Sequence, residues 1–261
     1  MKNMKSTLPT RLGFYNTLST VLVAGVLSIT SLSSAQAAIA LDRTRAIISG
    51  DEKSISLSVS NENKQLPYLA QGWIENDKGE KITSPFTVLP PVQRIEPGAK
   101  SQVKIQVLPD VASLPKDRES VFYFNLREIP PKSDKPNTLQ IALQTRIKLF
   151  YRPEAIVPTR EQMDNPWQEK LTLTKAGDQY TVNNPTPYNV ILVDALPKKD
   201  GKTVAGFEPV MIAPKSSQVL GVSVSALGNS PVLTYINDYG GRPNLSFNCQ
   251  GNECKVVPAK K

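Results

Sequence analysis

The sequence predicts an all-β protein made of two antiparallel β-sandwiches in series, and three observations support this. Apolar residues alternate with serines at 55–59 and with Gln and Lys at 103–107. A period of two is typical of half-buried strands. Clusters of Gly and Pro, such as Asp77-Lys78-Gly79, Pro90-Pro91 and Gly240-Gly241, separate the runs. No long segment has the 3.6-residue period of an amphipathic helix, so we expect stacked sheets without covering helices.

The first 37 residues have the layout of a secretory signal peptide. The cations Lys2, Lys5 and Arg11 precede an apolar run from Leu18 to Ile29, and the small-x-small motif Ala35-Gln36-Ala37 follows. This order is typical of exported proteins. The alternative is a membrane anchor, but the run falls short of the ~20 apolar residues that a membrane span needs. We therefore expect a mature chain that starts at Ala38.

A boundary between two domains is predicted near residues 151–166, where prolines stand among polar residues. Proline stiffens a linker and blocks strand pairing through it. A second series of strand patterns begins at Leu171 and turns at Gly177-Asp178. Each half has about the length of one immunoglobulin-like sandwich. We therefore predict two such domains, at residues 38–156 and 157–261.

Composition argues against several classes of function. The chain has 31 Lys and Arg against 23 Asp and Glu, a net charge of +8 that falls to +5 without the signal peptide. These cations are scattered, which argues against a nucleic-acid partner. The chain has no His, so the usual general base and the Ser–His–Asp or Cys–His sites are missing. We expect no enzymatic activity, no small-molecule substrate, no cofactor and no metal site.

The two cysteines, Cys249 and Cys254, are predicted to form a disulfide. An exported protein meets an oxidising compartment in which such pairs oxidise. The alternative is a zinc site, but zinc takes about four ligands and the chain offers no His to complete the set. A bridge across so short a loop contributes only about 2 kcal/mol in the chain-entropy description. We expect it to fix one hairpin without holding the whole fold together.

Several segments resemble the PapD-type periplasmic pilus chaperones. They are the mature start Ala38-Ile39-Ala40-Leu41-Asp42-Arg43-Thr44-Arg45, the motif Asn125-Leu126-Arg127-Glu128-Ile129-Pro130, and the segment Leu139–Pro153. Two more, Asn63–Gln71 and Tyr235–Pro243, are similar to the P-pilus branch of that family. The resemblance covers nearly all of the mature chain. It implies an L-shaped molecule of two immunoglobulin-like domains with a cleft between them.

The resemblance also implies a function. Members of the family work in the periplasm, where they bind, fold and cap pilus subunits, both pilins and adhesins, and deliver them to an outer-membrane usher. They do so by lending a β-strand to the subunit. The short loop before Leu139 implies the short-loop subclass, which serves rod-like pili with complex tips.

The segment from Leu139 to Leu143 is the candidate donor strand. Its apolar residues Leu139, Ile141 and Leu143 alternate with Gln140 and Ala142. An ordinary strand that packs into its own core has the same pattern. The resemblance implies instead that the three apolar residues fill the groove of a subunit that lacks its last strand. Because an unprotected apolar edge promotes aggregation, we expect the free protein to cover it, with self-association as one way.

Arg45 and Lys148 are the residues that the resemblance implies for holding the subunit's terminal carboxylate. Taken alone, each could be an ordinary solvated cation on the surface. Arg43 and Arg146 stand two residues away from them. Spacing alone does not choose between the two pairs.

Glu119, Arg152 and Asp238 fall where the family keeps a charge network between its domains. Taken alone, they are three unrelated surface charges. A network of this kind is expected to set the angle of the cleft more than to add stability, because desolvation offsets the attraction.

A structural pilus subunit or adhesin is the alternative function. Such proteins also have signal peptides and immunoglobulin-like folds. They differ in carrying a donor segment at their own N-terminus and an incomplete fold. Here residues 38–45 are predicted to form a strand of the first domain, and a second whole domain follows.

Overall fold

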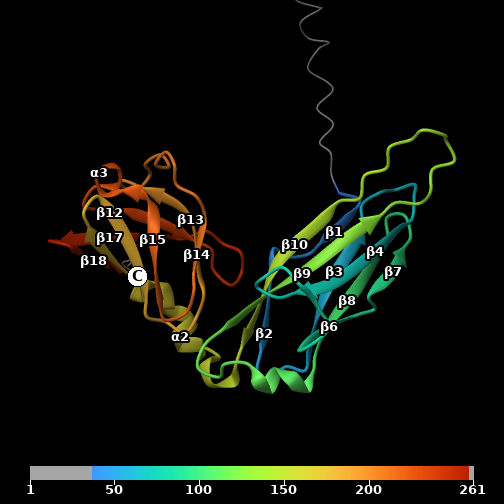
Figure 1. The fold of residues 1–261 in the computed structure, drawn as a ribbon, viewed down its shortest axis with the longest axis horizontal. Helices are drawn as coiled ribbons and strands as arrows, with labels where there is room; N and C mark the ends of the chain where they lie inside the picture. The colour runs from blue at the N-terminus through green and yellow to red at the C-terminus, as the bar shows by residue number, and fades with distance from the viewer. Residues whose placement is uncertain (1–36, 259–261) are drawn as a thin grey trace, which may run out of the picture. The chain divides into compact units, whose positions relative to one another are not determined.

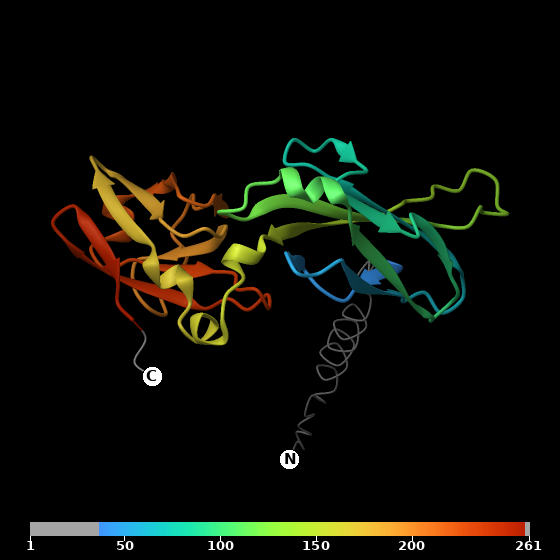
Figure 2. The same cartoon turned by 90° about the horizontal axis from the view of Figure 1, so that it is seen from below.

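The computed structural model of the protein describes residues 37–258. The predicted signal peptide lies outside the described residues apart from its last residue, Ala37. Two strand-rich regions follow one another along the chain (Figures 1 and 2). We call residues 39–152 the first sandwich and residues 172–256 the second sandwich. The all-β prediction is confirmed.

The first sandwich consists of two sheets. One has the strand order β1-β3-β8-β6, with β1 at Ile39–Leu41, β3 at Ser54–Asn61, β8 at Lys100–Val107 and β6 at Phe86–Leu89. The other has the order β2-β10-β9-β4-β5, and β7 also pairs with β4; the bounds are β2 Arg45–Ser49, β10 Gln144–Arg152, β9 Ser120–Ile129, β4 Tyr68–Glu75, β5 Lys81–Ile82 and β7 Val92–Ile95. Neighbouring strands are antiparallel except β2 and β10, which run parallel.

The core of the first sandwich lies between these sheets and follows from the period-two pattern. The predicted runs form β3 and β8, which pair with Leu57 opposite Val103. Their buried residues face Phe124 of β9 and Leu149 of β10 in one apolar cluster. Each fully buried side chain of this size stabilises the fold by about 1.5–3 kcal/mol.

The chain changes sheets just after its predicted mature start. The sequence predicts one strand over residues 38–45, and this prediction is wrong. β1 pairs with β3 in one sheet, whereas β2 pairs with β10 in the other. At the corner between them Arg43 donates two hydrogen bonds to the carboxylate of Asp42, at 3.0 and 2.8 Å. Alternation of apolar residues does not reveal such a switch, because both strands bury residues in the same core.

The second sandwich is a single hydrogen-bonded path of eight strands, in the order β14-β13-β16-β17-β18-β11-β12-β15. The bounds are β11 Thr172–Ala176, β12 Gln179–Asn184, β13 Val190–Leu196, β14 Val210–Ile212, β15 Ser216–Ser223, β16 Val232–Tyr235, β17 Asn244–Gln250 and β18 Glu253–Val256. All eight strands contribute to one apolar cluster, so the path folds over a common core. Cys249 and Cys254 stand opposite each other on β17 and β18 and form the predicted disulfide.

Helical structure is confined to short segments. The connection between the sandwiches contains 3-10 turns at Glu154–Ile156 and Trp167–Lys170 and the one-turn helix α2 at Arg160–Asp164. Elsewhere there is a 3-10 turn at Pro109–Ser113 and the helix α3 at Val224–Leu227. Among the described residues, no helix is both long and apolar enough for a membrane span. The domain boundary between residues 156 and 157 stays a prediction.

Gly50 offers a test of how tightly the connection packs on the first sandwich. A Cβ at this position would lie 2.3 Å from the backbone nitrogen of Glu154. We therefore expect Gly50→Ala to lower the free energy of unfolding by roughly 1–3 kcal/mol, because backbone atoms cannot yield as a flexible side chain can. Gly221→Ala is the matched control, since a Cβ there would meet no atom nearer than 3.9 Å. Equal urea midpoints for the two variants would contradict this.

Candidate functional site

The parallel pairing of β2 with β10 brings the two predicted anchor residues together. Arg45 opens β2 and stands opposite Lys148 of β10 in the strand register. Both residues are half-buried and line one pocket of about 280 Å³. The second sandwich contributes Ile191, Ile236 and Arg242 to the same pocket.

Neither Arg45 nor Lys148 forms an ion pair with any carboxylate in the part of the chain that the structure describes. Arg45 donates from Nη1 to the carbonyl oxygen of Ile236 at 3.4 Å, and its Nε is buried without a hydrogen-bond partner. Burial lowers the pKa of Arg45, an effect that Asp238 and Glu119 partly offset.

Burial also lowers the pKa of Lys148, the neighbour of Arg45 in the pocket. The positive charges of Arg45 and Arg146 lower this pKa further. The pocket thus holds two partly desolvated cations side by side, and neither has a carboxylate within ion-pair distance among the described residues. An arrangement of this kind favours an incoming anion, which relieves the repulsion and satisfies the free donors.

The two competing cations have carboxylate partners of their own. Arg43 pairs with Asp42 at 2.8 Å. Arg146 donates from Nε to Glu75 at 2.9 Å, and its guanidinium lies 3.4 Å from the centre of the Tyr123 ring. Arg43 and Arg146 therefore differ from Arg45 and Lys148 in having a carboxylate partner, a difference that spacing in the sequence does not reveal.

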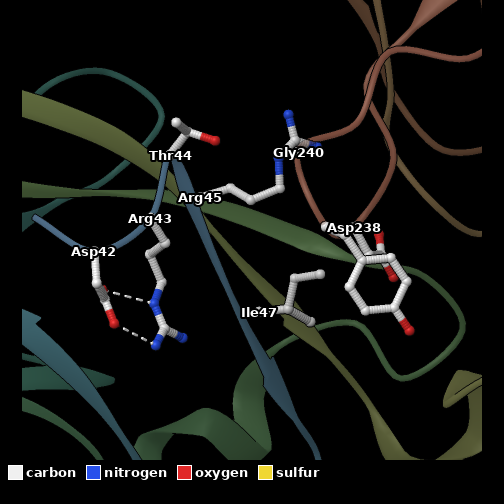
Figure 3. Close-up of a pocket in the computed structure, with 8 residues that line it drawn as sticks. Asp42, Arg43, Thr44, Arg45, Ile47, Asp238 and Gly240 are labelled. Carbon is white, nitrogen blue, oxygen red and sulfur yellow. Dashed lines mark hydrogen bonds and ion pairs between the residues drawn. The ribbon is translucent and has the colours of Figure 1, made fainter.

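A loop of the second sandwich, residues 236–243 between β16 and β17, closes one side of the site. Figure 3 shows Arg45 reaching from β2 toward the part of this loop that carries Asp238 and Gly240. The same residues border a second pocket of about 470 Å³. Gly240 has a φ of 82°, and a Cβ there would lie 3.2 Å from Oγ1 of Thr44. The positive φ and this tight contact with the first sandwich both favour glycine at this position.

Glu119, Arg152 and Asp238 come together as one network. Arg152 lies 2.7 Å from Glu119 and 3.0 Å from Asp238. Although burial acts to lower the pKa of Arg152, the two carboxylates raise it overall. Asp238 belongs to the 236–243 loop, so the network ties that loop to β10.

Sequence reasoning missed the neutral partners of this network. The backbone and side-chain nitrogens of Asn189 donate to Glu119 at 2.8 and 3.1 Å. The rings of Trp167 and Tyr188 lie 5.2 and 4.9 Å from the guanidinium of Arg152. An asparagine and two aromatic residues scattered over the second half of the chain give no signal that could have revealed this.

The candidate donor residues lie on the surface. Leu139, Ile141 and Leu143 are 84%, 64% and 42% exposed, so they are not packed in a core of their own. The predicted strand over Leu139–Leu143 is wrong, because these residues form no strand and β10 begins at Gln144. One backbone hydrogen bond, from Glu128 to the carbonyl of Leu143, continues the pairing with β9.

The reason for this lies in the edge of the sheet. β2 pairs with β10 only from Lys148 to Arg152. From Gln144 to Ile147, β10 pairs with β9 on one side and with no described strand on the other. The chain from Leu139 to Ile147 therefore presents a free edge that ends at the Arg45–Lys148 pocket. Within residues 37–258, no group of three or more potential metal ligands comes together.

Comparison with known proteins identifies related chains. The family description "Pili and flagellar-assembly chaperone, PapD N-terminal domain" matches residues 38–157, and "Pili assembly chaperone PapD, C-terminal domain" matches residues 166–247. The probable fimbrial chaperone YfcS of Escherichia coli K12 is 56% identical, over 92% of this chain and 93% of that protein. The chaperone protein PapD of Escherichia coli is 54% identical, over 88% of this chain and 94% of that protein.

A solved structure gives the same result for the fold. This chain matches the structure of the Salmonella enterica SafA pilin in complex with the SafB chaperone. The TM-score is 0.67 and the sequence identity is 26%. The match covers 82% of this chain and 97% of that one.

The charge network can be tested by a double-mutant cycle. Arg152→Met leaves the carboxylate of Glu119 buried without its cation, so we expect the free energy of unfolding to fall by about 3–5 kcal/mol. Adding Glu119→Gln to that variant should recover part of the loss, because contacting residues are not additive. Urea denaturation of the two single variants and the double variant measures the coupling. Strict additivity would show that the two residues do not interact.

Proposed function

This chain belongs to the PapD family of pili-assembly chaperones, and we propose that it captures pilus subunits through the Arg45–Lys148 pocket and the free edge at 139–147. One observation carries the proposal above all. Two half-buried cations that have no ion-pair partner among the described residues lie side by side at the end of an exposed apolar edge. A guest with a terminal carboxylate could bind the two cations, and an open groove in the same guest could take up the apolar edge.

The pocket is proposed to hold the terminal carboxylate of the subunit. Arg45 supplies a planar fork of donors and Lys148 a compact charge. Hydrogen bonds to charged groups contribute about 1.5–3 kcal/mol each. Because the free Nε of Arg45 is already buried, little further desolvation is needed when the anion enters.

The proposed anchoring of the carboxylate implies a direction for the guest. Its last residue lies at Lys148, and the preceding residues run back along the edge toward Leu139. The guest strand therefore runs in the same direction as the donor segment, and the pairing is parallel. Ten residues from Leu139 to Lys148 span about 30 Å when extended, which is long enough for a whole strand of a sandwich.

The apolar residues Leu139, Ile141 and Leu143 are proposed to fill the groove of the subunit. Their burial gains about 1.5–3 kcal/mol per side chain, less the cost of ordering the segment and of association. Main-chain hydrogen bonds along the edge add to this. Anchoring the carboxylate fixes the register, because a slip of one residue would turn every inserted side chain to the wrong face.

The subunit is proposed to fold on this edge in the periplasm and to pass to an outer-membrane usher. The exposure of Leu139 and Ile141 supports transient covering of the segment, by a subunit or by a second copy of the chain. The network of Glu119, Arg152 and Asp238 is proposed to hold the 236–243 loop against the pocket.

Substitution of the anchor residues provides the direct test. We expect Arg45→Ala or Lys148→Ala to reduce capture of pilus subunits by roughly tenfold or more, since each removes a charged hydrogen bond. The measurement is co-purification of subunits from the periplasm with the tagged protein, at matched expression. Arg43→Ala is the control, because Arg43 already has Asp42 as its partner. Undiminished capture by both anchor variants would refute the proposed role.

Substitution in the donor segment separates binding from stability. Because Ile141 is exposed in the free protein, Ile141→Ser should leave the free energy of unfolding within about 0.5 kcal/mol of the original. The same change should weaken subunit capture several-fold, because it removes apolar area buried only in the complex. Val219→Ser, at an exposed apolar residue of β15, is the control. If Ile141→Ser lowered stability and left capture intact, the segment would belong to the protein's own fold.

A further inference from the structure

We infer that Arg242 is a third cation of the carboxylate pocket and contacts the guest's terminal carboxylate from the second sandwich. This inference rests on the proposed function. It adds a residue on the 236–243 loop to Arg45 and Lys148 of the first sandwich. Arg146 of β10 also lines the pocket, but it pairs with Glu75.

The position and the pairing of Arg242 support this role. It lines the same pocket as Arg45 and Lys148. Among residues 37–258, no carboxylate lies within ion-pair distance of Arg242. The acid of its own loop, Asp238, pairs with Arg152 instead. Arg242 thus lacks a carboxylate partner among the described residues, as Arg45 and Lys148 do. Arg43 and Arg146, by contrast, each have one.

The loop holds the backbone around Arg242 in place. The side chain of Asn237 accepts hydrogen bonds from the nitrogens of Tyr239 and Gly241, at 3.1 and 2.8 Å. On the other side of Arg242, the carbonyl of Pro243 accepts from the nitrogen of Tyr235 at 3.1 Å. Only the exposed side chain of Arg242 remains to be ordered, which keeps the entropic cost of contacting a ligand small.

The chemistry of a carboxylate leaves room for a third cation beside the anchor pair. Two carboxylate oxygens present about four lone-pair sites. Arg45 directs one of its N–H groups to the carbonyl of Ile236, and Lys148 is a compact charge without a planar fork of donors. The guanidinium of Arg242 can supply two parallel donors to the remaining sites. A carboxylate held in this way would join the two sandwiches through the ligand.

Isothermal titration with a pair of peptides tests the inference. Each peptide carries about 12 C-terminal residues of a subunit that co-purifies with the protein, long enough to span the edge. One peptide ends in a free carboxylate and the other in a carboxamide. We expect Arg242→Ala to weaken binding of the carboxylate peptide about tenfold and to leave binding of the carboxamide peptide unchanged. Arg242→Lys should recover part of the loss.

Arg160→Ala is the matched control, because it removes the same charge from an exposed residue of α2. It should bind both peptides like the original protein. If the original protein prefers the carboxylate peptide and Arg242→Ala keeps that preference in full, the role of Arg242 is refuted and the proposed function stands. If the original protein binds both peptides equally, the carboxylate site itself is refuted, and the role of Arg242 with it.

Discussion

The parallel pairing of β2 with β10 is the constraint on which the site depends. It is limited to five residue pairs, and this short length has two effects. At its start it sets Arg45 beside Lys148, which concentrates positive charge in a half-buried position. Beyond that point it leaves the strand edge uncovered, so the same strand that ends at the cations offers free backbone groups before them. The proposed anchor and the free edge therefore arise from one feature of the sheet.

The buried guanidinium of Arg152 complements this arrangement. It is neutralised on one side by Glu119 and on the other by Asp238, and both carboxylates have defined partners. The loop that bears Asp238 is thereby held near Thr44, and its closest approach to Thr44 is at Gly240. Charges that are paired fix the structure of the site, and the cations without an ion-pair partner in the described part of the chain are the ones proposed to bind the ligand. Because Asp42, Glu75, Glu119 and Asp238 pair with other arginines, they form no ion pair with Arg45 or Lys148.

Much of the fold could be predicted from the sequence, because period-two runs such as 55–59 and 103–107 are set by the pleat of a strand. The pairing of Arg45 with Lys148 came from family resemblance, since residues so far apart carry no mutual spacing signal. The switch of sheets at Asp42–Thr44 was not predictable from local pattern. Nor was the loss of strand structure at Leu139–Leu143, where the alternation is regular but no neighbouring strand is present to pair with it. The carboxylate partners of Arg43 and Arg146 depend on tertiary contacts that only the structure shows.

The cross-strand disulfide sits at a particular point of the second sandwich. β17 and β18 are the junction in the strand path, with β14, β13 and β16 on one side and β11, β12 and β15 on the other. A slip at this hairpin would misalign both halves at once. The bond therefore fixes the register of the hairpin that joins the two halves of the path, and its small loop adds little to the free energy of unfolding.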